Sequence, residues 1–320
     1  MVYLKDNGKI NFILYCHYNF KEVLTGGILA THYLAYQIAK KGHNVYIFTE
    51  PHYKHENIHT LKSWRVERFI EDGTTGKEGE RRQWEQFSYP TSKTVVVYNQ
   101  DTYSNPLGIP NVSRWMLYTP QSHILKTWEK SDSIFTYGNQ TSLKEGINKI
   151  EGNLIAMDFR LDLFKNNNNP QREGFCHLLH KHTSPNAQTF LQELNSTSLN
   201  DWKSKGVWDY MAKQFNNHKY FITYDQLSFW PQVAALCGCI PIVMNPPTHK
   251  DSYYPQSTLP EQYKTRNPLK KYGVAFGMGD IPHAINTNHL VKPHIEEMDN
   301  QNQETIDNFV KFWENKLKND

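Results

Sequence analysis

Residues 218–244 determine the fold class, and they read HKYFITYDQLSFWPQVAALCGCIPIVM. This pattern predicts an apolar strand, a polar turn at Tyr224-Asp225-Gln226, a helix from about Ser228 to Leu236, and a second buried strand at Ile240 to Met244. Strand, helix and strand in close succession are typical of an α/β fold with a parallel sheet. The turn and the first helical N–H groups then face the crevice at the carboxyl end of the sheet, where an anion such as a diphosphate is stabilised.

A similar unit opens the chain. We expect a strand at Ile10 to Cys16, a loop containing Gly26-Gly27, a helix over about Ile28 to Lys41, and a strand at Val45 to Thr49. The turn at residues 42–44 ends this helix. The unit lacks the G-x-G-x-x-G fingerprint, so a dinucleotide cofactor is not indicated.

Further strands and helices complete two such units. At 320 residues, the chain is long for one domain and sufficient for two of roughly 150 residues each. The polar stretch KNNNNPQ lies near the middle and favours a connection between domains at about residues 157–172. We therefore predict an N-terminal domain (1–160), a C-terminal domain (161–295) and a closing helix (296–320). The other expected elements are strands at Thr94–Tyr98, Trp115–Tyr118, Ser133–Tyr137, Gly174–His180 and Gly273–Phe276, and helices at Ser184–Leu194 and Val207–Phe215.

Composition argues against several classes of protein. A net charge of +3 without a basic stripe does not favour nucleic acid as a partner. No apolar run reaches the roughly 18 residues of a membrane span, and the polar start MVYLKDNGK does not resemble a signal peptide. The expectation is a cytoplasmic protein. The four cysteines lie in or beside apolar runs, which favours buried thiols over disulfides or metal ligands: Cys16, Cys176, Cys237 and Cys239.

The C-terminal segment carries an apolar face at helical spacing, formed by Ile306, Phe309, Val310 and Trp313. This spacing predicts a helix that docks on a core. A helix lying on a membrane surface is the alternative, because Lys311, Lys316 and Lys318 lie near aromatic residues. Peripheral contact with the inner membrane face therefore remains open.

Three stretches of the sequence, in order, resemble glycosyltransferases of the two-domain GT-B fold, in a bacterial and viral subgroup similar to group 1 or family 4 enzymes. Together they make up a little under a quarter of the chain. The stretches are TGGILATHYLAYQIAKKGHNVYIFT (25–49), VVVYNQDTYSNPLGIPNVSRWMLYTPQS (95–122) and YDQLSFWPQVAALCGCIPIVM (224–244).

The resemblance implies two Rossmann-like domains that face each other across a cleft. The C-terminal domain would hold a nucleotide-sugar donor and the N-terminal domain a glycan or glycolipid acceptor. Many retaining members carry two glutamates eight positions apart in the third stretch, whereas Asp225 and Val233 occupy these positions here. The stereochemical outcome, retention or inversion, is therefore left open.

The candidate donor-binding residues lie at turns and helix starts. Asp225 can contact sugar hydroxyls from an Asx-type turn, beside Tyr224. Ser228 can join backbone N–H groups around a phosphate or only cap the helix. Gln232 follows on the same face of that helix and can read ribose hydroxyls or face solvent. The glycine pair Gly26 and Gly27 permits a close backbone approach to a ligand, or only a tight turn.

Two basic residues bracket the first strand of the C-terminal unit, where the resembling family places phosphate-binding side chains. They are Arg172 and Lys181. Arg172 alternatively belongs to the linker surface.

Candidate bases follow the strands of the first unit. His17 can remove the acceptor proton in an inverting mechanism, with Asp101 and His123 as further candidates. If configuration is retained, the departing phosphate can take the proton. Asn105 and Arg114 are expected to shape the acceptor side.

No metal or other cofactor is expected. The sequence lacks Asp-x-Asp, the usual divalent-metal motif of the other major glycosyltransferase fold. The histidines at positions 177, 180 and 182 alternate between the faces of a strand, which disfavours a zinc site.

The leading hypothesis is thus a cytoplasmic, metal-independent glycosyltransferase (EC 2.4 class, hexosyl or related sugar transfer) of polysaccharide, lipopolysaccharide or glycoprotein glycan biosynthesis. A GT-B-fold sugar-nucleotide epimerase and a non-catalytic nucleotide-sugar or glycan-binding module are the alternatives. Donor sugar, nucleotide base, acceptor and oligomeric state are not encoded in recognisable motifs.

Overall fold

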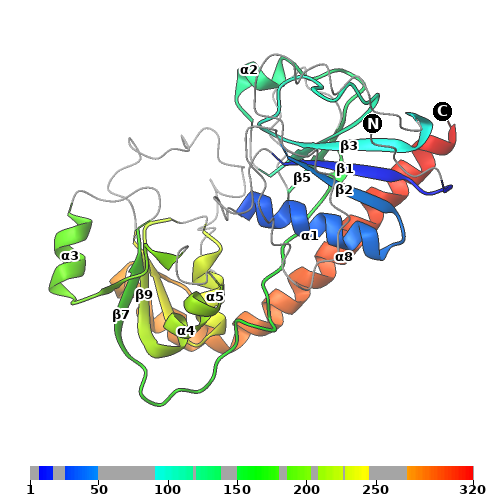
Figure 1. Cartoon of the computed structure of the whole chain (residues 1–320). Coiled ribbons are helices and arrows are strands. Elements are labelled where there is room, and N and C mark those ends of the chain that lie inside the picture. The colour runs from blue at the N-terminus through cyan, green and yellow to red at the C-terminus, as the bar shows by residue number, and fades with distance from the viewer. Residues whose placement is uncertain are drawn as a thin grey trace. The chain divides into compact units, whose positions relative to one another are not determined.

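The structure, a computed structural model, consists of two compact units. One unit comprises Met1–Asp158 together with Asp299–Asp320, and the other comprises Phe159–Met298, so the chain crosses between them twice. Each unit is an α/β fold built on a parallel sheet (Figure 1). The structure describes residues 7–16, 26–49, 91–117, 120–137, 150–179, 186–202, 208–225, 228–244 and 272–319.

The sheet of the first unit has the strand order β2-β1-β3-β4-β5-β6. All neighbouring strands run parallel, and β1 lies between β2 and β3. The strands are β1 (Asn11–Cys16), β2 (Asn44–Thr49), β3 (Thr94–Asn99), β4 (Asn111–Met116), β5 (Ser133–Thr136) and β6 (Ile150–Asn153).

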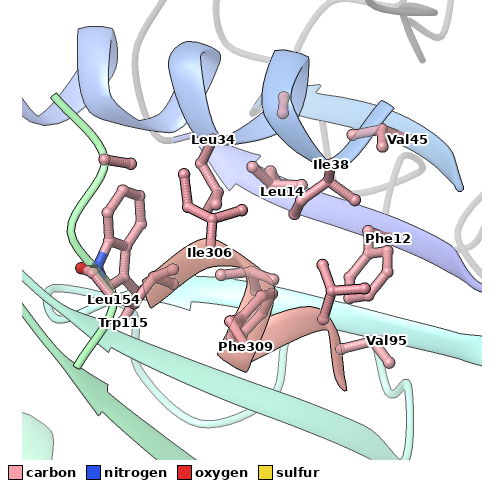
Figure 2. Close-up of a cluster of buried hydrophobic side chains, with 14 of the residues drawn as sticks. Phe12, Leu14, Leu34, Ile38, Val45, Val95, Trp115, Leu154, Ile306 and Phe309 are labelled. Carbon is pink, nitrogen blue, oxygen red and sulfur yellow. Dashed lines mark hydrogen bonds between the residues drawn. The ribbon is translucent and has the colours of Figure 1, made fainter. Parts of the chain in front are cut away.

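Two helices cover one face of this sheet: α1 (Gly26–Lys40) and the C-terminal part of α8 (Val291–Asn319). Their apolar side chains interdigitate with those of the central strands (Figure 2). The Trp115 indole also donates a hydrogen bond to the Leu154 carbonyl, at 2.8 Å, inside this cluster. The opposite face buries a second apolar set, so the central strands are apolar on both sides, as parallel strands usually are.

The face of α8 predicted to dock on a core does so. Ile306, Phe309 and Trp313 are fully buried, and Val310 is nearly so. All four belong to the cluster that α1 and the first sheet form. Lys316 lies over the rings of Phe312 and Trp313 of the same helix.

The sheet of the second unit has the order β11-β10-β9-β7-β8, again with parallel neighbours. Helices α3 (Ala187–Glu193) and α7 (Ile281–Thr287) pack on one face. Helices α4 (Trp208–Asn217) and α5 (Trp230–Leu236) pack on the other through aromatic contacts. The strands are β7 (Glu173–Leu178), β8 (Thr197–Ser198), β9 (His218–Thr223), β10 (Ile240–Val243) and β11 (Ala275–Phe276).

The described strands of both sheets follow the same order along the chain. The first strand of each sheet pairs with the second on one side and the third on the other. In the first sheet, the connections that follow β1 and β3 therefore run in opposite directions. In the second sheet, the same holds for the connections that follow β7 and β9. In open α/β sheets, ligands bind outside the carboxyl ends of the strands at such a switch point.

Short remaining helices are α2 (Ser122–Leu125) and three single turns of 3-10 helix: η3 (Thr91–Lys93), η6 (Met278–Asp280) and η7 (Asn288–Leu290). Among the described residues, no helix is both long and apolar enough to cross a membrane.

Candidate functional site

The switch point of the first sheet carries Asn99, the last residue of the switch strand β3, followed by Gln100 and Asp101. The Asn99 carboxamide accepts hydrogen bonds from the Asp101 N–H, at 3.2 Å, and from the Thr102 hydroxyl, at 3.0 Å. Gln100 is buried and links β3 to β4, because its amide oxygen accepts from the Leu117 N–H at 3.0 Å. Its amide nitrogen donates to Asp101 Oδ2 at 2.9 Å. The carboxylate of Asp101 is thus held at the edge of the sheet.

Arg114 lies behind the loop that follows Asp101. It is completely buried and pairs with Asp132, with 2.7 Å between Nε and Oδ2. Its Nη1 donates to the Thr102 carbonyl and its Nη2 to the Ser104 carbonyl. The guanidinium also stacks against Tyr98 and Trp128. Arg114 therefore fixes the loop that follows Asp101, and its predicted role in shaping an acceptor side stays a prediction.

Asn105 is engaged in the same loop. Its carboxamide oxygen accepts from the Tyr98 hydroxyl, and its amide nitrogen donates to the Ile109 carbonyl, both at 2.8 Å. The Tyr98 hydroxyl in turn accepts from the Leu107 N–H at 3.0 Å. Asn105 thus organises the turn, and its predicted influence on the acceptor side acts through loop shape.

His123 lies at the start of α2 and is exposed. Its Nε2 lies 2.6 Å from the hydroxyl of Tyr103, a residue that sequence reasoning missed. Tyr103 is 53% exposed. Nothing in the sequence distinguishes it from the other tyrosines, because its exposure follows from the loop that Arg114 fixes.

The glycine pair of the first unit belongs to α1 itself. The helix was expected from about Ile28, whereas it begins at Gly26. The first N–H groups of a helix have no partner within it, so those of Gly26 and Gly27 can bind a ligand. A Cβ at Gly26 would meet no atom within 4 Å. Internal packing therefore does not require glycine at this position.

In the second unit, Tyr224 and Asp225 follow the switch strand β9, as predicted. Both are buried. The Asp225 N–H donates to Thr223 Oγ1 at 3.2 Å, and its carbonyl accepts from the Ser228 N–H at 3.3 Å. Burial raises the pKa of Tyr224, which keeps its hydroxyl protonated. Its ring packs in the apolar cluster of α3 and α7, so a donor contact would use the hydroxyl or the backbone.

Ser228 lies one residue before Phe229, the N-cap of α5. Its hydroxyl accepts from the N–H of Trp230, the first residue of the helix, at 3.2 Å. The hydroxyl thus serves the start of the helix, although it does not occupy the N-cap position of the capping alternative. Gln232 lies one turn further on and is half-buried. Contacts of either residue with a donor remain predictions.

Arg172 lies away from the switch point of the second sheet. It precedes β7 and so lies at the amino end of that strand, opposite the switch point. Its guanidinium donates to the carbonyls of Asn216 and Cys237, at 3.2 and 2.7 Å, and to the Asn166 carboxamide at 3.1 Å. A six-residue strand spans about 20 Å. This position argues against contact with the donor phosphate, and it shows that Arg172 joins the ends of α4 and α5.

Two predicted residues, His17 and Lys181, lie outside the described residues. His17 follows β1 and Lys181 follows β7 in the sequence, so each comes after a switch strand. Within the described ranges, no three His, Cys, Asp or Glu side chains are grouped to hold a metal ion. Metal independence stays a prediction.

The described cysteine side chains are free, buried thiols, as expected from the sequence: Cys176, Cys237 and Cys239. Burial raises the pKa of Cys237 to about 12 and that of Cys176 well above its ordinary value. The cysteine thiolate is the reactive form, so Cys176 and Cys237 are inert near neutral pH. His177 is buried in β7 beside Ser196, with 2.9 Å between Nδ1 and Oγ.

Comparison with solved structures extends the likeness to nearly the whole chain. Sucrose-phosphate synthase from Thermosynechococcus elongatus matches with a TM-score of 0.52 and 13% sequence identity, over 96% of this chain and 94% of that one. The chain has the GT-B fold. Two α/β units with parallel sheets are the architecture that the sequence resemblance implied, and this prediction is confirmed. No protein-family model matches the sequence, and no curated protein matches it significantly.

Proposed function

We propose that the chain is a metal-independent glycosyltransferase that moves a sugar from a nucleotide-sugar donor to a glycan or lipid-linked acceptor. The observation that carries this proposal is the GT-B fold shared with a sucrose-phosphate synthase over 96% of the chain. Polar side chains at the switch points of both sheets support it, since these are the ligand-binding edges of α/β sheets.

The second unit holds the donor in this proposal. Asp225 follows β9, and its backbone is tied to Thr223 and Ser228. These backbone contacts hold the residue at the end of β9, and its carboxylate accepts hydrogen bonds from sugar hydroxyls in this proposal. Lys181 follows the other switch strand in the sequence and lies outside the described residues, and in this proposal it supplies positive charge to the leaving diphosphate.

The first unit holds the acceptor. Asp101 is positioned by Asn99 and Gln100 and can accept the proton of the attacking hydroxyl. His17 is the alternative base. If the sugar is transferred with retention, the leaving phosphate takes this proton and Asp101 serves only to orient the acceptor.

A thermal-shift screen tests the donor part of the proposal. The intact chain is heated with UDP, GDP, CDP and dTDP and with their common sugar conjugates, with and without magnesium. Ligands that bind the native state raise the melting temperature by mass action. We expect one nucleotide class to raise it without magnesium, and no shift with any of them would contradict the proposal.

The variant Asp225→Asn then tests whether Asp225 takes part in the transfer reaction. Removal of one charged contact to the transferred sugar should lower the rate of transfer about 100-fold. Asp209→Asn is the matched control, because Asp209 is exposed on α4 in the same unit. Equal transfer rates for Asp225→Asn and the control would show that Asp225 has no part in the reaction. Turnover of the donor without an acceptor would indicate an epimerase instead.

A further inference from the structure

Tyr103 is the most exposed of the large hydrophobic side chains among the described residues, at 53%. It lies two residues after Asp101, in the loop that follows the switch strand β3. A tyrosine that stabilises a fold buries its ring, since the gain comes from removing apolar surface from water. The contacts of the loop around Tyr103 fix the ring in this exposed position.

Buried groups hold the backbone on both sides of Tyr103. Arg114 donates from Nη1 to the carbonyl of Thr102 and from Nη2 to that of Ser104. The Trp128 indole donates to the Thr102 carbonyl as well, at 3.2 Å. The guanidinium is fully buried, and its charge is balanced by Asp132. A buried ion pair is thus placed directly behind an exposed aromatic residue.

The backbone at Ser104 is strained. Its φ of 49° lies in the left-handed region, which residues other than glycine adopt at a cost. The Ser104 N–H is fixed by the Thr127 hydroxyl at 2.9 Å. Strain of this kind persists only where the surrounding structure determines the conformation, and it concentrates at binding sites.

The ring of Tyr103 is held at its tip as well. Its hydroxyl lies 2.6 Å from His123 Nε2, and the two ring centroids are 5.6 Å apart with an interplanar angle of 35°. A ring fixed by its backbone and its hydroxyl loses little further conformational freedom when a ligand binds.

We propose that Tyr103 is a stacking platform for a pyranose ring of the acceptor, an inference that rests on the proposed transferase function. The C–H groups of a pyranose form an apolar patch that packs on an aromatic face, while its hydroxyls need polar partners at the rim. His123 lies at the hydroxyl of Tyr103, and Asp101 precedes Tyr103 by two residues in the same loop. In this proposal both supply such partners. An aromatic surface with a few fixed polar groups is the usual composition of a small-molecule site.

Saturation-transfer difference NMR tests this inference with defined probes. The probes are the methyl pyranosides of the common hexoses and N-acetylhexosamines, together with maltose and lactose. We compare the wild-type chain with Tyr103→Phe, Tyr103→Ala and the control Tyr272→Ala, which removes another exposed tyrosine. Unchanged melting temperatures verify that each variant folds.

The expected result is saturation of the ring C–H protons of at least one saccharide by the wild-type chain. Loss of an aromatic stacking partner should weaken this saccharide about fivefold in Tyr103→Ala. Tyr103→Phe should retain most of the binding, and Tyr272→Ala all of it. The inference would be overturned if Tyr103→Ala bound the saccharide as tightly as the wild type, or if the wild type bound no saccharide.

A parallel nucleotide screen separates this inference from the proposed function. Tyr103→Ala should keep the nucleotide-induced rise in melting temperature of the wild type. If nucleotides raise the melting temperature but Tyr103→Ala binds saccharides as well as the wild type does, the stacking role of Tyr103 is wrong and the transferase proposal stands. If saccharides depend on Tyr103 but no nucleotide binds, the platform stands and the transferase proposal fails.

Discussion

A substitution at Gly26 can distinguish a role in folding from a role in ligand binding. A Cβ at this position meets no atom within 4 Å, and the residue lies in the first turn of α1. Gly26→Ala should therefore raise the free energy of unfolding by about 0.5 kcal/mol, because alanine loses less conformational entropy. If a phosphate approaches the backbone here, the same change should weaken nucleotide binding about tenfold.

The measurement for Gly26→Ala is urea denaturation together with a nucleotide titration. Gly279→Ala is the control, since Gly279 also has open space around it and lies in the other unit. Nucleotide affinity equal to that of the control would mean that Gly26 serves only to begin a helix.

His177 makes the stability of the second unit depend on pH. Burial lowers its pKa below the ordinary 6.5, so the unfolded chain binds more protons than the folded one as the pH falls below about 6.5. The free energy of unfolding should therefore decrease from pH 7 to pH 5.5. His177→Asn keeps a polar partner for Ser196 and should show a smaller decrease in urea denaturation at these two pH values. An equal decrease in both proteins would contradict this role of His177.

At the scale of elements, the loop after β3 depends on Arg114. Arg114→Met leaves Asp132 buried without its partner and should cost about 3–5 kcal/mol of unfolding free energy. The double change Arg114→Met and Asp132→Leu should recover much of this loss, because no buried charge remains. Urea denaturation measures both.

The control for Arg114 is Arg160→Met, which breaks the pair with the exposed Asp162. Surface pairs contribute less than about 1 kcal/mol, so this variant should remain close to the wild type. If Arg114→Met were as stable as the wild type, the structural role of the buried pair would be refuted.

The sequence predicts most elements because their apolar runs are continuous. Strands β1, β3 and β10 lie within one or two residues of their expected bounds. Strand β4 was expected around Trp115 but begins at Asn111, since its buried polar residues, Ser113 and Arg114, do not look like core in a sequence. The short strands β6 and β8 were not predicted, because neither carries an apolar run.

The candidate site was predicted less completely than the fold. Asp101 and Asp225 follow switch strands, and this is visible in the sequence because each comes directly after an apolar run. The position of Arg172 before β7 already places it at the amino end of that strand, whereas its contacts with Asn216 and Cys237 could not be read from the sequence. The exposure of Tyr103 depends on contacts from Arg114 and Trp128. Such long-range contacts leave no local pattern.

At the scale of the whole molecule, the last helix completes the core of the first unit. Phe309→Ala should cost about 3–5 kcal/mol, because its ring is fully buried against Phe12 and Phe135. Glu304→Ala is the control on the same helix, since Glu304 is exposed and should change stability by no more than about 0.5 kcal/mol. Thermal denaturation of both variants checks this, and equal melting temperatures would contradict it.

Because the C-terminal part of α8 belongs to the first unit, the two units are completed in a fixed order during translation. Residues 159–298 are translated after the first unit's last strand and before the segment that closes its core. At about 5–20 residues per second, this interval is on the order of 10 s. During that time the nascent first unit lacks α8, so only α1 covers the sheet face that both helices cover in the folded protein, whereas the sequence of the second unit is complete at the end of the interval. The unit that is synthesised first is therefore the one that is completed last, and a chaperone has this interval in which to bind it.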